Sequence, residues 1–365
     1  MNKLKVIQLL PELNIGGVER GTKDFSSALV QRGHESIVIS NGGIFEDDIV
    51  KDGARHIKIP IHKKSLFSLL LSKKLRTVYE EEKPDIVHVR SRMPAWINFY
   101  AFKRLIKKPI LISTFHGLYS TPVYSKVMSK VDHMIAISNT VKEYIKNTYN
   151  VSNDKISVIP RGCDMDHFNK DQVDNDWINE WFREFPQTKN KIILTLPTRI
   201  SKWKGVDNFI ELISRLDGNV FHGLIVGPTS NSKLRYLNSL KKKISELGIN
   251  KSITFTGSRN DISNIYKISD IVFNLSIDPE PFGRTTIEAI SCGAKFIGWD
   301  HGGTKEILEE LFPNGLVPLG NINALEEKVI KVSDKNYLTP KENVFTSERM
   351  INETINLYHQ LLSTE

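Results

Sequence analysis

Two glutamates in the stretch PEPFGRTTIEAISCG, residues 279–293, stand eight positions apart on either side of a Pro-Phe-Gly turn. They are Glu280 and Glu288, and Thr285 or Thr286 between them is of a type that often begins a helix. The pattern therefore predicts a helix with Glu288 in its first turns. Two carboxylates beside one helix N-terminus require partners that are cationic or carry hydroxyl groups, so the stretch is a candidate binding site.

Cations and a histidine follow two predicted strands elsewhere. Arg199 and Lys204 lie beyond the end of KIILTL (191–196). His116 follows ILIST (110–114). Because ligands bind outside the carboxyl ends of the strands in open α/β sheets, these residues are candidates for an anion site and for catalysis. Surface charge and a structural histidine are the alternative explanations.

A pair of glycines, Gly16 and Gly17, follows the first apolar run, LKVIQLL (4–10), and precedes a helical pattern. Glycines at such a place let the backbone approach an anion closely, and the helix N-terminus favours negative charge. The G-x-G-x-x-G pattern is absent, and a simple tight turn explains the two glycines equally well.

Short apolar runs alternate with helical patterns along the chain, which predicts an α/β protein with mostly parallel, doubly wound sheets. A polar stretch without a strand, residues 165–190, separates two sets of runs and is interpreted as a linker region. We therefore expect two Rossmann-like domains, residues 1–168 and 169–345, and a C-terminal amphipathic helix (346–365). The predicted strands are 4–10, 35–40, 86–89, 110–114, 133–138 and 156–160 in the first set, and 191–196, 221–227, 252–257, 270–276 and 294–299 in the second.

The composition of the 365 residues is that of a folded soluble protein, with 40% hydrophobic and 25% charged residues. Domains have about 150 residues on average, so a chain of this length is also expected to contain two domains. Two cysteines fit a reducing compartment. The opening segment does not resemble a signal peptide, and no run approaches the roughly 20 apolar residues of a membrane span. We therefore expect a cytoplasmic protein.

The net charge of +8 is concentrated in the N-terminal half, where residues 1–165 hold 26 Lys and Arg against 16 Asp and Glu. Such asymmetry predicts an anionic partner. HKKSLFSLLLSKKLR (62–76) and FKRLIKK (102–108) combine basic and apolar residues, which favours an anionic membrane surface. The alternative is that Leu66, Leu69 and Leu70 pack a helix onto its sheet. No nucleic-acid partner is expected, since no recognised motif is present.

The glutamate pair stands in an E-x-F-G-x-x-x-x-E-A pattern, and Arg199, Lys204 and Gly205 form Arg-x₄-Lys-Gly. With Gly162-Cys163-Asp164 at the domain junction, the sequence resembles the retaining nucleotide-sugar glycosyltransferases of family 4 along essentially its whole length. The resemblance implies the GT-B architecture, in which two Rossmann-like domains face a cleft. It also implies that the first domain binds the acceptor, that the second binds the donor, and that the C-terminal helix returns to the first.

The resemblance assigns roles to individual residues. Glu288 would accept hydrogen bonds from the ribose, Glu280 would face the transferred sugar, and the backbone from Gly283 to Thr285 would face the diphosphate. The implied catalytic residues are His116, Arg199, Lys204 and Glu280. The implied donor-binding residues are Gly16, Gly17, Phe282, Gly283, Arg284, Thr285 and Glu288.

No metal and no cofactor are expected beside the nucleotide-sugar co-substrate. Two D-x-D triplets, residues 164–166 and 174–176, lie at or near the domain junction. In metal-dependent GT-A enzymes such a motif holds the ion that binds the diphosphate. On the family model, Arg199 and Lys204 perform that task here, and the histidines lack the spacing of zinc ligands.

A second, local resemblance concerns the acceptor. HVRSRMPAW (88–96), followed by STFHGLY, is similar to bacterial glycosyltransferases of lipopolysaccharide core assembly. It places Arg90, Arg92 and Trp96 where an anionic, lipid-linked core sugar could bind. The alternative is that Arg90 and Arg92 are ordinary surface groups after a strand.

The function expected from the resemblance is transfer of a hexose, with retention, to a glycan or lipid-linked acceptor in lipopolysaccharide or other cell-envelope glycan synthesis. The enzyme would work in the cytoplasm at the inner face of the plasma membrane. Two alternatives remain, a GT-B sugar-nucleotide epimerase and a non-catalytic two-lobed nucleotide or sugar binder. The turn after Gly227 and the pair Asp300-His301 depart from common family patterns, which leaves the nucleotide and the sugar open.

Overall fold

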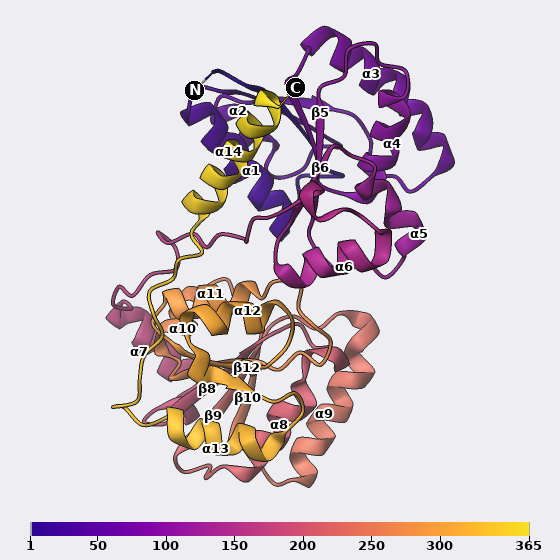
Figure 1. Ribbon diagram of the computed structural model, residues 1–365. Coiled ribbons are helices and arrows are strands. Elements are labelled where there is room, and N and C mark those ends of the chain that lie inside the picture. Colours follow the sequence, from indigo (N-terminus) through magenta and orange to yellow (C-terminus); the bar gives the residue numbers. More distant parts are fainter. Residues whose placement is uncertain (1, 365) are drawn as a thin grey trace. The chain divides into compact units, whose positions relative to one another are not determined.

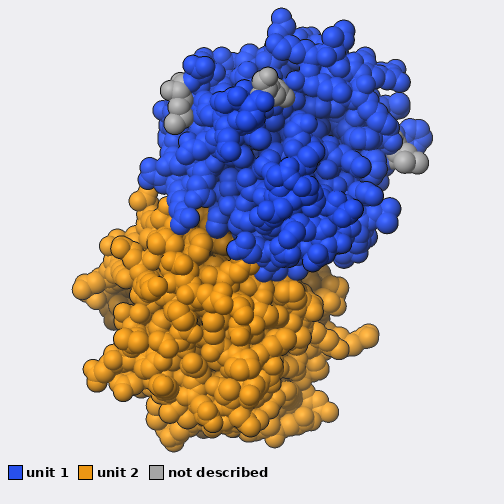
Figure 2. Space-filling model, in the orientation of Figure 1, with its two compact units in different colours: residues 1–160, 348–365 blue, residues 161–347 orange. Residues whose placement is uncertain are grey.

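The computed structural model describes residues 2–364, apart from the side chain of Leu66. The chain forms two compact units, residues 1–160 with 348–365 and residues 161–347 (Figure 2). Among the described helices, none combines the length and the apolar character that a membrane crossing requires.

Unit 1 is built on a seven-stranded parallel sheet with the strand order β3-β2-β1-β4-β5-β6-β7 (Figure 1). Its central strands are buried along their whole length, as the apolar runs predict. The strands are β1 (Lys5–Leu9), β2 (Glu35–Ser40), β3 (Arg55–Lys58), β4 (Ile86–Val89), β5 (Ile110–Phe115), β6 (His133–Ala136) and β7 (Ile156–Val158).

Helices cover both faces of this sheet. The helices and 3₁₀ turns of unit 1 are α1 (Gly17–Gln31), α2 (Glu46–Lys51), η1 (Leu66–Leu70), α3 (Leu71–Glu82), α4 (Arg92–Phe102), α5 (Pro122–Ser125), η2 (Lys126–Ser129), α6 (Asn139–Tyr149), η3 (Asn153–Lys155) and α14 (Ser347–Ser363). In Figure 1, α1 and α14 lie on one side of the sheet, and α3 and α4 lie on the other. Phe25 of α1 and Tyr358 of α14 meet edge to face within one apolar core that also includes residues of β1, β4, β5 and β6.

The predicted C-terminal helix is present as α14, and a buried histidine ties it to the sheet. His88 of β4 shares one hydrogen bond of 2.6 Å with the hydroxyl of Tyr358 and another of 2.6 Å with the hydroxyl of Thr114 on β5. Burial, with a smaller contribution from Arg90, lowers the pKa of His88 well below 6.5. The ring is therefore neutral, and it joins two strands and a helix that lie far apart in the sequence.

Unit 2 is built on a six-stranded parallel sheet with the order β10-β9-β8-β11-β12-β13. Its strands are β8 (Ile192–Pro197), β9 (Phe221–Val226), β10 (Ile253–Gly257), β11 (Ile271–Asn274), β12 (Lys295–Trp299) and β13 (Leu316–Val317). Its helices and 3₁₀ turns are α7 (Asn175–Glu184), η4 (Pro186–Thr188), η5 (Lys202–Lys204), α8 (Val206–Arg215), η6 (Asn231–Lys233), α9 (Leu234–Glu246), α10 (Ile262–Ile268), α11 (Arg284–Ser291), α12 (Gly302–Leu311), η7 (Pro313–Gly315) and α13 (Ile322–Val332). In Figure 1, α10, α11 and α12 lie on one side of the sheet and α8, α9 and α13 on the other.

The predicted α/β class and the two doubly wound sheets are confirmed, and every predicted strand is present with small shifts at its ends. Two strands were not predicted. The edge strand β3 has the sequence RHIK and is partly exposed, so it lacks an apolar run. Strand β13 has two residues, which is too short for a pattern.

The segment 165–190 is not a free connection between the units. It contains α7, whose Trp181 is buried in a cluster with Phe185 and with residues of β8, β9 and α10. The units divide at residue 160, where the sequence suggested 168. The N–H of Cys163 donates to the carbonyl of Phe345 at 2.8 Å, so the chain leaving unit 1 runs beside the chain returning to it.

Acid should weaken unit 1, because His88 remains neutral in the fold while its pKa in the unfolded chain is about 6.5. Below that pH the unfolded chain binds a proton that the native state does not bind, so the free energy of unfolding falls with pH. Urea unfolding between pH 7.5 and pH 5.5 measures the slope. At pH 7.5, Tyr358→Phe should cost about 1–3 kcal/mol by removing a hydrogen-bond partner from the buried ring.

The control is Tyr337→Phe in unit 2, whose ring is half-buried and whose hydroxyl forms no hydrogen bond within residues 2–364. It should leave the free energy of unfolding nearly unchanged. Equal effects of the two substitutions would contradict the role given to the His88 cluster.

Candidate active site

The loop between β11 and α11 carries the glutamate pair, and glycines allow its backbone to pack closely. Gly283 precedes α11 with a φ of 99°, a left-handed conformation that side chains other than glycine rarely adopt. A Cβ atom on Gly303, at the start of α12, would lie 2.4 Å from the Cα of Phe282. The N–H of Gly303 also donates to the carbonyl of Glu280 at 2.8 Å. The missing side chain of Gly303 and its hydrogen bond to Glu280 therefore allow α12 to pack directly against the loop.

Glu280 and Lys204 contact each other directly. Nζ of Lys204 and Oε1 of Glu280 form an ion pair in which both side chains are mostly shielded from solvent. The hydroxyl of Ser276 donates to the same carboxylate oxygen at 2.7 Å. Lys204 follows β8 and Glu280 follows β11, and these strands are neighbours in the sheet. The sheet thus brings together two of the residues that the sequence singled out.

The turn that carries Lys204 is fixed to the glutamate loop through the backbone. The N–H of Ile277 donates to the carbonyl of Trp203 at 2.7 Å. Gly205 has a φ of 70°, and a Cβ atom there would lie 1.8 Å from the carbonyl oxygen of Leu275. The Arg-x₄-Lys-Gly pattern therefore requires glycine at position 205, because the backbone there packs directly against Leu275, the residue after β11.

Glu288 lies in the second turn of α11 and is buried, and its Oε1 accepts a hydrogen bond of 2.9 Å from Arg284. Arg284 is partly exposed. The helix begins at Arg284 after Gly283, so the expectation that Thr285 or Thr286 begins it is wrong. The left-handed glycine turns the chain one residue earlier and places both threonines inside the first turn.

Arg199 does not join the Lys204–Glu280 pair. It lies two residues after β8 and is exposed, and it forms no ion pair within residues 2–364. Lys202, in the same turn as Lys204, is also exposed. The three cations of this segment thus differ, since only Lys204 is held against a carboxylate.

Two residues that were not predicted as site residues complete this arrangement. Ser276 contacts Glu280, and the Nε2 atom of His301 lies 2.8 Å from the carbonyl oxygen of Ser276. His301 belongs to the pair that departs from common family patterns, which was the only signal for it. Nothing local in the sequence distinguishes Ser276 from other loop serines.

In unit 1, Gly16 and Gly17 stand at the start of α1. Gly16 precedes the helix with φ −178° and ψ 163°, which is extended backbone. A tight turn with positive φ is therefore not the reason for this glycine. His116 directly follows β5 and is half-buried, and its backbone N–H donates to the hydroxyl of Tyr119 at 3.4 Å.

Arg90 is not a surface group, so that interpretation is wrong. It is 8% exposed, and its guanidinium lies over the ring of Phe25 at 5.4 Å from the ring centre. Burial lowers the pKa of Arg90 to about 10. The strand end simply turns the side chain inward, beneath α1.

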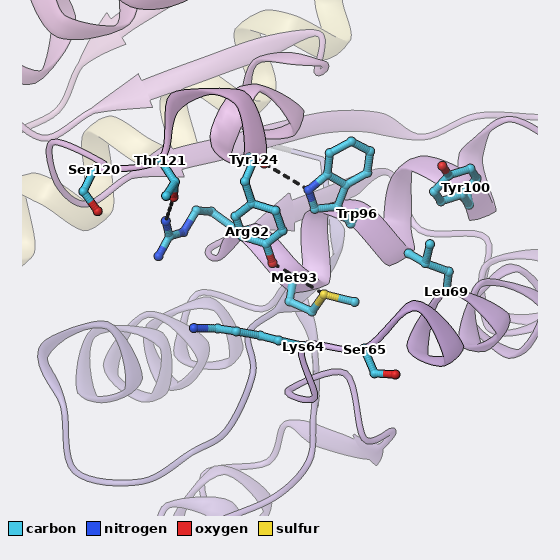
Figure 3. A pocket seen from close by; sticks show the side chains of 10 residues that line it. All are labelled: Lys64, Ser65, Leu69, Arg92, Met93, Trp96, Tyr100, Ser120, Thr121 and Tyr124. Carbon is cyan, nitrogen blue, oxygen red and sulfur yellow. Dashed lines mark hydrogen bonds between the residues drawn. The ribbon is translucent and has the colours of Figure 1, made fainter.

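Arg92 and Trp96, one turn apart on α4, both line a cavity of unit 1 (Figure 3). A guanidinium nitrogen of Arg92 donates to the hydroxyl of Thr121 at 3.0 Å. The indole N–H of Trp96 donates to the carbonyl of Tyr124 at 3.0 Å. The three candidate acceptor residues therefore do not form one cluster, because Arg90 does not line this cavity.

Within residues 2–364, no group of three His, Cys, Asp or Glu side chains is arranged to hold a metal ion. In both D-x-D triplets, the first aspartate accepts hydrogen bonds from nearby backbone N–H groups. Asp164 accepts hydrogen bonds from the N–H groups of Asp166 and His167, and Asp174 accepts one from Asp176 at the start of α7.

Models of two protein families match the chain. Glycosyltransferase Family 4 matches residues 15–167, and Glycosyl transferases group 1 matches residues 178–352. The matches fall on unit 1 and unit 2, respectively, and extend a few residues across their boundaries.

Several related proteins align with the chain over essentially its whole length. A glycosyltransferase structure from Rickettsia africae ESF-5 is 30% identical, covers 100% of both chains and superposes with a TM-score of 0.84. The N-acetyl-alpha-D-glucosaminyl L-malate synthase of Bacillus anthracis is 24% identical over 99% of this chain and 98% of its own. The UDP-Gal:alpha-D-GlcNAc-diphosphoundecaprenol alpha-1,3-galactosyltransferase of Escherichia coli is 26% identical over 98% of this chain and 97% of its own.

Gly205→Ala should destabilise unit 2 and displace Lys204, because the new methyl group meets the Leu275 carbonyl. Gly248→Ala is a matched control: it has the same φ of 70°, but no atom lies within 4 Å of its Cβ position. The control should cost about 1–2 kcal/mol of backbone strain, and Gly205→Ala clearly more. Thermal unfolding measures both, and equal losses would show that the contact is unimportant.

Proposed function

Because the chain belongs to glycosyltransferase family 4, we propose that it is a retaining enzyme that moves a hexose from a nucleotide-diphosphate sugar to a glycan or lipid-linked acceptor. The contact between Lys204 and Glu280 carries this proposal. It places a cation and a carboxylate together at the carboxyl ends of neighbouring strands, close to the start of α11. A nucleotide-sugar donor offers the matching groups, since its phosphates bind cations and its hydroxyls donate to carboxylates.

Donor binding would exchange the partners of this pair. Lys204 would leave Glu280 for a phosphate oxygen, and Glu280 would accept hydrogen bonds from hydroxyls of the transferred sugar. The N–H groups from Gly283 to Thr285, at the N-terminus of α11, would face the diphosphate, where the helix dipole favours negative charge. Glu288 would accept from the ribose. Arg199, which is exposed and unpaired among the described residues, would supply a second cation.

In the chemical step, the bond between the anomeric carbon and the phosphate oxygen breaks, and the acceptor oxygen bonds to that carbon from the same face. The acceptor proton passes to the leaving phosphate, whose new charge Lys204 and Arg199 stabilise. His116 would contact the transferred sugar. Retention is supported by the segment that forms and follows β4 and β5, residues 86–131, because it contains no Asp or Glu that could act as a general base.

The acceptor and the place of action are supported by the relatives and by charge. The name of the Escherichia coli relative includes a UDP-linked donor and a diphosphoundecaprenol-linked acceptor. The basic residues of unit 1 fit an anionic membrane, at whose inner face the enzyme would build lipopolysaccharide or another envelope glycan. The cations at the donor site also support transfer without a metal ion.

A screen of UDP-, GDP-, ADP- and CMP-sugars should identify a donor that raises the melting temperature. That donor should release nucleotide when a membrane extract that contains the acceptor is added, and an α-linked donor should give an α-linked product by NMR. A sugar-nucleotide epimerase would convert the donor without acceptor, and a non-catalytic binder would release nothing. A β-linked product would reject retention.

Lys204→Ala and Arg199→Ala should each lower turnover by about 100-fold or more, the magnitude of a lost charge-stabilising group. Lys202→Ala is the control, because this neighbouring lysine has the same charge and forms no ion pair among the residues that the structure describes. It should retain near-normal turnover, and EDTA should leave the wild-type rate intact. Equal losses in all three variants, or inactivation by EDTA, would overturn the assignment.

A further inference from the structure

Unit 1 contains an open pocket of about 780 Å³ that the proposed donor chemistry does not use. Its walls come from the segment that begins η1, from the first turns of α4 and from the segment that begins α5 (Figure 3). The lining residues are Lys64, Ser65, Leu69, Arg92, Met93, Trp96, Tyr100, Ser120, Thr121 and Tyr124.

The two ends of the pocket differ in chemistry. In Figure 3, the charged ends of Lys64 and Arg92 lie at one end, whereas Leu69, Trp96 and Tyr100 lie at the other. The ring of Trp96 lies within 30° of parallel to that of Tyr100, at a centre distance of 6.4 Å. The single N–H of the indole is already bonded to a backbone carbonyl. This end therefore offers aromatic and aliphatic surface with few free polar groups.

Within residues 2–364, neither Lys64 nor Arg92 is paired with a carboxylate. Arg92 donates to the hydroxyl groups of Thr121 and Ser125 and lies over the rings of Tyr119 and Tyr124. Lys64 is exposed and forms no ion pair among the described residues. The segments that build the pocket, residues 61–79 and 86–131, contain 13 Lys and Arg and no Asp or Glu. The pocket therefore favours an anion at its charged end.

Large apolar side chains project into solvent from the same walls. Phe67 and Leu70 of η1 are 82% and 66% exposed, and Val123, next to Tyr124, is 88% exposed. The alternative that the leucines of this segment all pack onto the sheet is thus wrong for Leu70, and Leu69 lines the pocket. Exposed apolar residues among lysines are typical of surfaces that enter the interface of an anionic bilayer.

We propose that this pocket binds a phosphate-bearing lipid in the membrane, with the phosphate between Lys64 and Arg92 and the apolar chain along Met93, Trp96 and Leu69. Phe67 and Leu70 then enter the bilayer beside it. The inference rests on the proposed function, because a lipid-linked acceptor is an amphiphile of this class. It specifies which surface of unit 1 meets the membrane and which end of the acceptor the pocket holds.

The tryptophans provide a direct test. Trp96 is the only tryptophan of unit 1, and the others, Trp177, Trp181, Trp203 and Trp299, belong to unit 2. Phosphatidylcholine vesicles that contain phosphatidylglycerol with brominated chains should quench the fluorescence of the full-length protein. Trp96→Phe should lose most of that quenching while it still floats with the vesicles. Vesicles of phosphatidylcholine alone should bind and quench little.

Lys64→Gln with Arg92→Gln should weaken vesicle binding by about 5- to 30-fold at low salt, since each cation near an anionic leaflet contributes about fivefold. Lys51→Gln with Lys142→Gln removes the same charge from α2 and α6, and it should have a smaller effect. Phe67→Ser with Leu70→Ser changes only exposed side chains, so folding should be kept, and it should abolish quenching.

Flotation without quenching in the wild type would mean adsorption by surface charge alone, and it would overturn the proposal, as would an absence of flotation. Thermal shifts with nucleotide sugars report on unit 2 separately. Lost quenching with intact donor binding contradicts only the lipid pocket. Intact quenching without any donor binding or nucleotide release contradicts the proposed function.

Discussion

The ion pair between Lys204 and Glu280 is the contact on which the candidate site of unit 2 depends. The two side chains come from segments that follow neighbouring strands, and both are mostly shielded from solvent. Removing one partner from such a pair leaves the other charge poorly solvated, which costs far more than an exposed pair contributes. A ligand that separates the two groups must therefore offer each of them a new partner.

Backbone packing fixes the positions of the two segments that carry Lys204 and Glu280. Gly205 lacks the side chain that would push the Lys204 turn away from Leu275, and Gly303 lacks the one that would push α12 away from Phe282 in the glutamate loop. Hydrogen bonds between main-chain groups join both pairs of segments. Ser276 then fixes the carboxylate, and His301 contacts the backbone of Ser276. The side chains that would move on the proposed donor binding are thus carried by segments whose backbones are held by close contacts, which is the arrangement that preorganised sites require.

The fold was predictable wherever burial produces an apolar run, as in β4 and β5, and it was not predictable for the polar edge strand β3. The glutamate motif and the Arg-x₄-Lys-Gly pattern identified the two segments of the candidate site. They could not show that Lys204 contacts Glu280, because strand order places the two segments together and local patterns do not encode that order. For the same reason the pocket around Trp96 was not visible, since three separate segments form it. Arg90 was misjudged because residue type alone predicts exposure for arginine.

Calorimetric titration of Glu280→Gln with a nucleoside diphosphate tests the exchange of partners most directly. The diphosphate carries no sugar, so it makes no contact that Glu280 would supply in the complete donor. If Lys204 must leave Glu280 to bind phosphate, the variant should bind the diphosphate several-fold more tightly than the wild type, and that gain should vanish in a Lys204→Ala background. Equal or weaker binding by Glu280→Gln would contradict the account.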